Sequence, residues 1–341
     1  MGFTSVRKNC SPAILAGILV VSTAQHVRAQ VALRLERLAA VPGSGLAALG
    51  GVADAAIDVQ GVIYLIDPSR PGILAVDQRL HHLRTFGRRG SGPGEFREPI
   101  AIRALSGNRM GVLDRALRRL SIYRSVRDSL LVFERAITLG IASESMCGLP
   151  DGTFLIYGFA NGKRIHIFSP AGKMLRSFGE ADRRLSPMAG DLMVHGRVFC
   201  DADGAEVVVT SKFLPVVEMF RISTGLQLWV DTLRPFRPLQ LTDEGTSVTI
   251  SGGPGGNSLI ASILNVGAYN IFQTTFDSRM DGATLDTVFT YARSTVRGRW
   301  SLPRIDWPLL FQLKKDLALG VEVREDLELA LYRLRPTQGQ R

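Results

Sequence analysis

Residues 86–99 read FGRRGSGPGEFREP, and this stretch decides how the chain can fold. Four glycines and one proline fall within nine consecutive residues, a density that neither a helix nor a strand accommodates. Apolar runs flank the segment, IYLI at 63–66 and VL at 112–113. We therefore predict a compact crossing between two β-structured units. Phe96 would pack between them, and Pro99 would open the next strand, where its missing N–H does least harm.

The strand pattern on either side of this crossing recurs along the chain. In the clearest unit, polar turns join strands at 63–67, 73–77 and 83–86. With the first of these as a marker for the second strand of a unit, the units begin near residues 63, 110, 154, 207, 259 and 317. Such spacing is typical of four-stranded propeller blades. The predicted fold is all-β, a six-bladed β-propeller with blades at about 51–97, 98–140, 141–190, 191–235, 236–291 and 292–336.

The sixth unit lacks a last strand, and the N-terminal segment 31–38 (VALRLERL) can supply it. The C-terminal half of this segment alternates apolar and polar residues, as an edge strand does. An open propeller would leave two apolar blade faces in water. We therefore expect 31–38 to complete the last blade and close the ring. A short amphipathic helix over 31–40 is the alternative.

Residues 1–29 have the pattern of a secretory signal peptide. Two basic residues precede an apolar run at 13–21, which is too short to span a bilayer, and small residues stand at Val27 and Ala29. Cleavage after Ala29 would lower the formal net charge from +10 to +7 and leave 30–341 as one domain, secreted or periplasmic. A retained anchor helix is the alternative.

The crossing at 86–99 resembles the linker of NHL-repeat proteins, F-G-x-x-G-x-G-P-G-E-F-x-x-P. The preceding segment 63–77 resembles the same repeat through its I-Y-x-x-D and I-x-x-V-D spacings. Good matches cover about 51–180, and later units match only by spacing and strand pattern. The resemblance implies a six-bladed propeller of a kind found in lactonases, amidating lyases, sugar-oxidising quinoproteins and pure binding modules. Function must therefore be argued from a site.

Enzymes of this architecture hold a metal near the mouth of the channel with several histidines or carboxylates. Histidine is scarce here, and among those left after cleavage only His195 precedes an inner strand, so no zinc site is predicted. Carboxylates near the starts of inner strands could form a calcium site, but arginines at similar points would neutralise them in salt bridges, which we favour. The channel candidates are Asp54, Arg97, Glu98, Glu144, His195, Arg197, Arg304 and Asp306.

A second group of candidates lies on the loops between second and third strands and on the crossing. These share one end of the propeller, and loops on a rigid scaffold are where recognition usually occurs. The candidate ligand-binding residues are Asp67, Arg70, Arg88, Arg89, Asp114, Arg115 and Arg118. Their arginine content points to an anionic ligand, because a guanidinium pairs bidentately with such groups. The alternative is that Asp67 and Asp114 only cap their turns beside solvated arginines.

These patterns favour a non-enzymatic binding propeller that recognises a protein, peptide or glycan, and the arginines favour an anionic one. The alternative is a calcium- or zinc-dependent hydrolase or lyase with its site at the central channel. No cofactor is predicted, and a bound calcium ion is the alternative. The 35 arginines are spread evenly along the chain, which predicts no nucleic-acid partner. No segment after the signal peptide is apolar enough to span a membrane, and a monomer is expected.

Cys147 and Cys200 are the cysteines that remain after cleavage. Both fall in predicted inner strands of neighbouring blades, which approach one another at the channel, so we expect the two residues to lie close together. An oxidising compartment permits a disulfide between them. Two buried free thiols are the more common state for such residues, and that state is favoured here.

Overall fold

The computed structural model describes residues 33–336 with internal gaps. The positions left undescribed inside this range are 47–48, 128–129, 182–188, 190–194, 239, 246, 252–256, 278–286, 296–297, 299, 301–306 and 324–326. The predicted signal peptide at 1–29 and the channel candidates Arg304 and Asp306 therefore lie outside the described residues.

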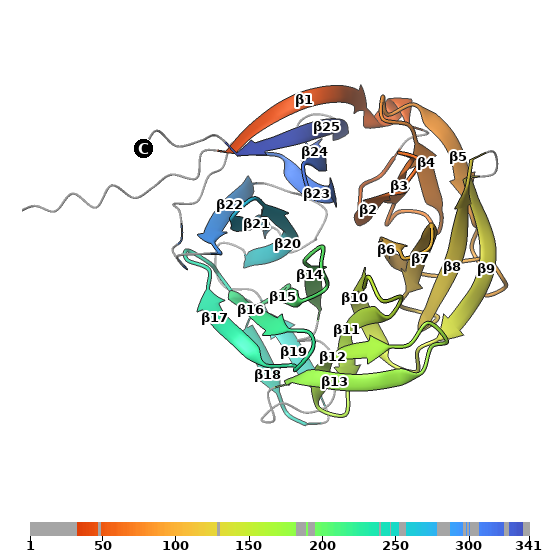
Figure 1. Cartoon of the computed structure of the whole chain (residues 1–341). Helices are drawn as coiled ribbons and strands as arrows, with labels where there is room; N and C mark the ends of the chain where they lie inside the picture. The colour runs from red at the N-terminus through yellow and green to blue at the C-terminus, as the bar shows by residue number, and fades with distance from the viewer. Residues whose placement is uncertain are drawn as a thin grey trace, which may run out of the picture.

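Six sheets surround a central channel, each with one strand along the channel and the others further out (Figure 1). Each inner strand contacts the next around the ring, and the last contacts the first. The chain is therefore an all-β, six-bladed propeller, as the repeat spacing predicts. The inner strands are β2 (Asp54–Ile57), β6 (Pro99–Leu105), β10 (Ala142–Gly148), β14 (Gly196–Cys200), β20 (Asn257–Val266) and β23 (Leu309–Lys314).

Antiparallel strands follow outward from each inner strand. In the first blade they are β3 (Ile63–Ile66), β4 (Ile73–Val76) and β5 (His82–Phe86), and in the second they are β7 (Arg109–Asp114), β8 (Arg119–Val126) and β9 (Leu130–Thr138). In the third blade they are β11 (Phe154–Ala160), β12 (Lys163–Phe168) and β13 (Met174–Glu180). In the fourth blade they are β15 (Glu206–Ser211), β16 (Val216–Arg221) and β17 (Gln227–Thr232). Every residue of β3 and β4 is buried, because neighbouring blades cover both faces of the sheet. This explains why these strands are continuous apolar runs.

The fifth blade corrects one detail of the repeat assignment. Its described strands are β20, β21 (Tyr269–Asp277) and β22 (Thr287–Ser294). A separate hairpin of β18 (Gln240–Asp243) and β19 (Val248–Ser251) precedes them. The marker near residue 259 lies in the inner strand β20, so its assignment to the second strand is wrong. The pattern misleads because β20 is ten residues long and rich in apolar residues, and local pattern carries no information on distance from the channel.

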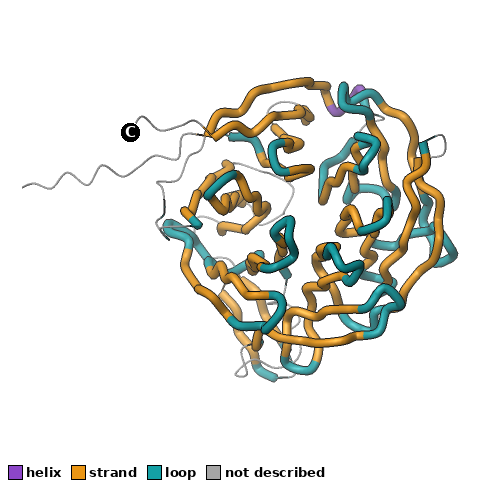
Figure 2. The backbone as a smooth tube through the Cα atoms, viewed as in Figure 1, coloured by secondary structure: helices purple, strands orange, loops and turns teal. Residues whose placement is uncertain are grey.

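The ring closes as the N-terminal segment predicts. Strand β1 (Leu33–Pro42) pairs antiparallel with β25 (Leu327–Pro336), outside β24 (Leu317–Val323) and β23 in the sixth blade. The register runs from Leu33 opposite Pro336 to Pro42 opposite Glu328. Residues 33–40 are therefore strand, and the helical alternative is wrong over that range. Figure 2 shows a short helical turn, η1 (Gly43–Gly45), on the path from β1 to the first inner strand.

The crossing at 86–99 packs as its sequence predicts. Phe96 is fully buried in a cluster that draws on both the first and the second blade, and its ring lies 6.3 Å from that of Tyr123. Gly87 has a φ of +75°, and a Cβ there would lie 2.5 Å from the Phe96 ring. Glycine is therefore required at this position on two grounds. Pro99 begins the inner strand β6.

Candidate functional site

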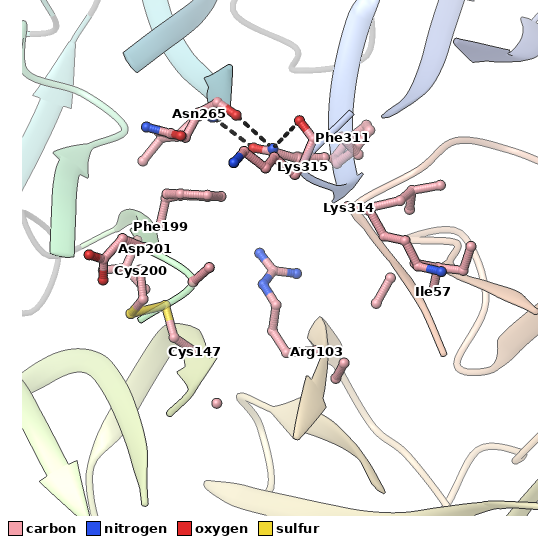
Figure 3. A pocket seen from close by; sticks show the side chains of 18 of the residues that line it. Ile57, Arg103, Cys147, Phe199, Cys200, Asp201, Asn265, Phe311, Lys314 and Lys315 are labelled. Carbon is pink, nitrogen blue, oxygen red and sulfur yellow. Dashed lines mark hydrogen bonds between the residues drawn. A yellow bond between two sulfur atoms is a disulfide. The ribbon is translucent and has the colours of Figure 1, made fainter. Parts of the chain in front are cut away.

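A cavity of about 680 Å³ lies in the channel, at the end where inner strands lead into second strands (Figure 3). Residues from all six inner strands line it, together with the loops that follow them, such as Ser106, Pro150 and Ala202. This volume lies within the range of small-molecule sites. In an antiparallel blade, the loop between the first and second strands and the loop between the second and third strands lie at opposite ends. The cavity therefore lies at the opposite end of the propeller from the loops that the sequence predicts to bind a ligand.

Asp54 and two arginines form the floor of the cavity. Asp54 is 2% exposed, accepts a hydrogen bond of 2.9 Å from the backbone N–H of Ile102, and pairs with the guanidinium of Arg103. Its other oxygen lies 3.4 Å from Nη1 of Arg197, and Nη2 of Arg197 donates to the carbonyl of Ala53 at 2.6 Å. Inner strands of the first, second and fourth blades therefore meet at one buried carboxylate, and Arg197 reaches it from across the channel. These contacts explain why a charged residue can begin β2.

The walls of the cavity combine aromatic rings with polar contacts between blades. Phe199 and Phe311 both line it, and the guanidinium of Arg197 lies 5.4 Å from the centroid of the Phe311 ring, within cation–π distance. Asn265 and Gln312 join the fifth and sixth blades: the Asn265 N–H donates to Gln312 Oε1 at 2.7 Å, and Gln312 Nε2 donates to the Asn265 carbonyl at 2.8 Å. These bonds hold the two strands at fixed spacing beside the cavity.

A disulfide between Cys147 and Cys200 forms another part of the wall (Figure 3). It joins the inner strands β10 and β14 of neighbouring blades, and the two Cα atoms are 6.1 Å apart. The expected proximity is confirmed, whereas the favoured state of two free thiols is wrong. The cysteines lie at the same level of adjacent strands, so their side chains meet across the blade boundary at a Cα separation that is usual for a disulfide.

The opposite end of the channel holds a charged cluster around Arg115. This arginine donates to Glu144 at 3.0 Å and also pairs with Glu98. Its Nη1 lies 3.3 Å from Nδ1 of His195, whose ring in turn lies 5.8 Å from that of Phe213. Sequence reasoning favoured salt bridges for these carboxylates, and the structure places them in such pairs. The partner is Arg115, however, from the turn after β7.

Burial changes the protonation behaviour of this cluster. Desolvation, followed by the positive charges of Arg115 and Lys212, lowers the pKa of His195 to about 4. Desolvation also raises the pKa of Glu144, against the stabilising charge of Arg115. His195 is therefore neutral at neutral pH, and its Nδ1 accepts a hydrogen bond from Arg115. The Glu144 carboxylate lies 3.3 Å from the same nitrogen and would become an ion-pair partner only on protonation of His195.

The residues predicted for the ligand-binding face serve several roles. Asp67 is buried and accepts hydrogen bonds from Gly50, Ser69 and Arg70. Asp114 is also buried and accepts hydrogen bonds from the backbone N–H groups of Arg97, Glu98 and Leu117. Both aspartates thus cap their turns. Arg70 and Arg88 form partly or largely exposed ion pairs, and Arg115 belongs to the channel cluster. Arg89 and Arg118 are exposed.

The channel candidates divide between the two ends. Asp54 and Arg197 meet at the floor of the cavity, whereas Glu98, Glu144 and His195 meet at Arg115. The side chain of Arg97 is exposed.

Sequence reasoning missed Arg103, Lys314 and Lys315, because only the starts of inner strands were considered. One signal could have found Arg103: it is a lone charge inside the apolar strand PIAIRAL.

Across the residues that the structure describes, no group of three or more histidine, cysteine, aspartate or glutamate side chains is placed to hold a metal ion. Within the same residues, no helix has the length and apolar character needed to cross a membrane.

Comparison with known proteins finds neither a matching protein-family model nor a matching curated protein. Among solved structures, the chain is similar to a "Putative exported protein" from Bacteroides fragilis, with a TM-score of 0.59 and 9% identity over 92% of this chain and 98% of that one. It is also similar to a DUF4221 family member from Bacteroides vulgatus (TM-score 0.54, 8% identity, 90% and 100% covered) and to a protein from Lactobacillus plantarum (0.50, 14%, 84% and 84%). At these identities the likeness shows the fold alone.

Proposed function

We propose that this chain is an extracytoplasmic binding propeller that takes a small ligand, or one end of a larger one, in the central cavity beside Arg103. One observation carries the proposal: residues from all six inner strands line a cavity of about 680 Å³. Sites that bind small molecules are concave and largely apolar, with a few placed polar groups. Here Phe199 and Phe311 supply apolar surface, and Arg103 supplies the polar group.

The scaffold around the cavity is suited to binding without rearrangement. The disulfide, the Asp54 ion pairs and the Asn265–Gln312 hydrogen bonds each link different inner strands at the cavity. A preorganised site loses little conformational entropy when a ligand binds. A binding role therefore accounts for the placement of several cross-blade links around one space.

An extracytoplasmic location, secreted or periplasmic, is supported by two observations. A disulfide persists in oxidising compartments and is uncommon in the cytosol. The similar structure from Bacteroides fragilis is of a "Putative exported protein". A relationship to NHL-repeat proteins is supported by the crossing at 86–99, which matches that linker pattern in sequence and in which Gly87 and Phe96 lie close together.

The proposal is tested by filling the cavity. Ala104 is exposed and lines the cavity, so Ala104→Trp places an indole in it. Ala116 is exposed in the β7–β8 turn, at the other end of the blade, and Ala116→Trp is the matched control. We expect ligand-observed NMR of a fragment panel to detect fragments that bind the wild type and the control but not Ala104→Trp. Fragment binding that Ala104→Trp leaves unchanged would overturn the proposal.

A further inference from the structure

Arg103 presents one edge of its guanidinium to the cavity. Its side chain projects from β6 into the space, as Figure 3 shows, and is 25% exposed. Both of its protein contacts use the same nitrogen, Nη1, which pairs with Asp54 and donates to the Ile102 carbonyl at 2.6 Å. Among the described residues, Nε and Nη2 have no partner. One edge of a rigid, planar donor group is therefore available to a ligand.

The floor of the cavity carries an excess positive charge. Two guanidiniums, those of Arg103 and Arg197, meet the single carboxylate of Asp54. One carboxylate balances one guanidinium, so the described floor residues carry one net positive charge. At the rim, Lys314 and Lys315 are exposed. Among the described residues Asp201 is the carboxylate that lines the rim, so those residues also carry one net positive charge. The electrostatic field of both layers favours a negative ligand.

We propose that the cavity selects a small organic carboxylate with an apolar, aromatic-sized body, whose carboxylate lies against the free edge of Arg103. This inference rests on the proposed function and specifies its ligand class. A guanidinium binds a carboxylate through two parallel N–H donors. The partly desolvated floor lacks one negative charge, which a carboxylate supplies, whereas a phosphate monoester would bring nearly two there. The second positive charge lies on exposed rim lysines, where water and salt screen it. Phe199 and Phe311 would flank the apolar body.

Three matched probes test this assignment by isothermal titration calorimetry: 2-naphthoate, its neutral isostere 2-naphthamide, and 2-naphthyl phosphate. We expect the wild type to bind naphthoate about tenfold or more tighter than naphthamide, because a hydrogen bond to a charged partner is stronger than one between neutral groups. Naphthyl phosphate should bind more weakly than naphthoate. Raising the salt concentration should weaken the binding of naphthoate more than that of naphthamide.

Variants then assign the preference to Arg103. Arg103→Gln should weaken naphthoate binding about tenfold and leave naphthamide binding within about twofold. Arg103→Lys keeps the charge but removes the planar fork, so it should be intermediate. Arg118→Gln, at the opposite end of the propeller, should change neither. Should Arg103→Gln fail to fold, the lysine variant and the wild-type salt dependence decide the question.

The outcomes separate the ligand class from the site. Equal affinity for naphthoate and naphthamide, both lost in Ala104→Trp, would overturn the carboxylate assignment while the cavity remains the binding site. Tighter binding of naphthyl phosphate would also overturn it, in favour of a dianion. If no probe binds, or if Ala104→Trp leaves naphthoate binding unchanged, the carboxylate assignment is wrong. The fragment panel, which contains uncharged compounds, then decides the proposed function independently.

Discussion

At one end of the central channel Arg115 is paired with Glu98 and Glu144, whereas at the other end Arg103 uses a single nitrogen for its protein contacts. Both arginines lie inside the ring, and both contact carboxylates. The difference lies in the direct contacts. Two carboxylates pair with one arginine at the first end, where Lys212 adds a second positive charge, and two arginines pair with one carboxylate at the second. A charged channel residue therefore indicates a ligand only where its protein partners leave its donors unused.

Removal of the disulfide should have the largest effect on the cavity end. Cys147 and Cys200 are separated by 53 residues in sequence, and a cross-link over a loop of this length stabilises the fold by about 4 kcal/mol in the chain-entropy model. The Cys147→Ser, Cys200→Ser double variant should lose about that much in urea unfolding. Wild type treated with dithiothreitol serves as the control and should behave alike. An unchanged midpoint in both would show that this wall of the cavity is held by packing alone.

Loss of the shared carboxylate comes next. Asp54→Asn leaves Arg103 and Arg197 close together without their counterion, so the free energy of unfolding should fall by about 3 kcal/mol, the lower end for a broken buried pair. Asp151→Asn is the control, because Asp151 is exposed and asparagine keeps the oxygen that accepts from Thr153. Chemical denaturation of both variants gives the comparison. If Asp54→Asn costs no more than the control, the floor is solvated and its charge balance is not decisive.

The cluster around Arg115 should make the free energy of unfolding depend on pH. His195 has a pKa of about 4 in the folded protein and about 6.5 when unfolded, so between these values the unfolded chain binds more protons and stability falls as pH falls. Since the side chain is 24% exposed, we expect a loss of about 2 kcal/mol from pH 6.5 to pH 4. Burial raises the pKa of Glu144, so protonation of this carboxyl stabilises the folded chain as pH falls and offsets part of the loss from His195.

His195→Gln isolates the histidine from Glu144. The difference between wild type and variant across the pH series contains the His195 contribution, and the variant should lose less stability on acidification. Parallel curves from pH 7 to pH 4 would mean that His195 remains protonatable in the folded state.

Arginines at the end of the propeller opposite the cavity should have the smallest effect. Replacing Arg88, Arg89 and Arg118 together with alanine should change the free energy of unfolding by less than about 1 kcal/mol, because exposed charges contribute little. Differential scanning calorimetry checks this. The sequence also predicts that this variant loses salt-sensitive binding to an acidic ligand panel. Retained binding with an unchanged melting temperature would leave the cavity as the supported site, and unfolding would show that these arginines are structural.

Much of the fold could be predicted because its signals are local. The crossing at 86–99 has a composition that only a compact turn accommodates, and Phe96 packs as that composition requires. Strand β1 closes the ring, as predicted from a last unit that lacks a strand and an N-terminal segment that can supply one. The prediction that the strand near residue 259 is the second of its blade is wrong, because alternation and apolar content do not report distance from the channel.

The candidate site depended on contacts between strands far apart in the sequence. Glu144 and Glu98 were predicted to be neutralised by arginine, but the arginine is Arg115, 29 and 17 residues away, on a loop that reaches the channel only in the folded ring. The disulfide could not be predicted either, because it depends on the positions of Cys147 and Cys200 along the channel axis, and these two residues lie on strands of different blades.

From the sequence alone one could determine the number of blades, the crossing between the first two and the closure of the ring, since these follow from the order of apolar runs, turn residues and glycines along the chain. Only the tertiary structure decided that Arg103 faces a cavity, that Asp54 meets two arginines and that the cavity opens opposite the loops with most arginine. The physical reason is that a channel is formed by residues from six separate strands, so the partners and free donors of each charge depend on where neighbouring blades place theirs.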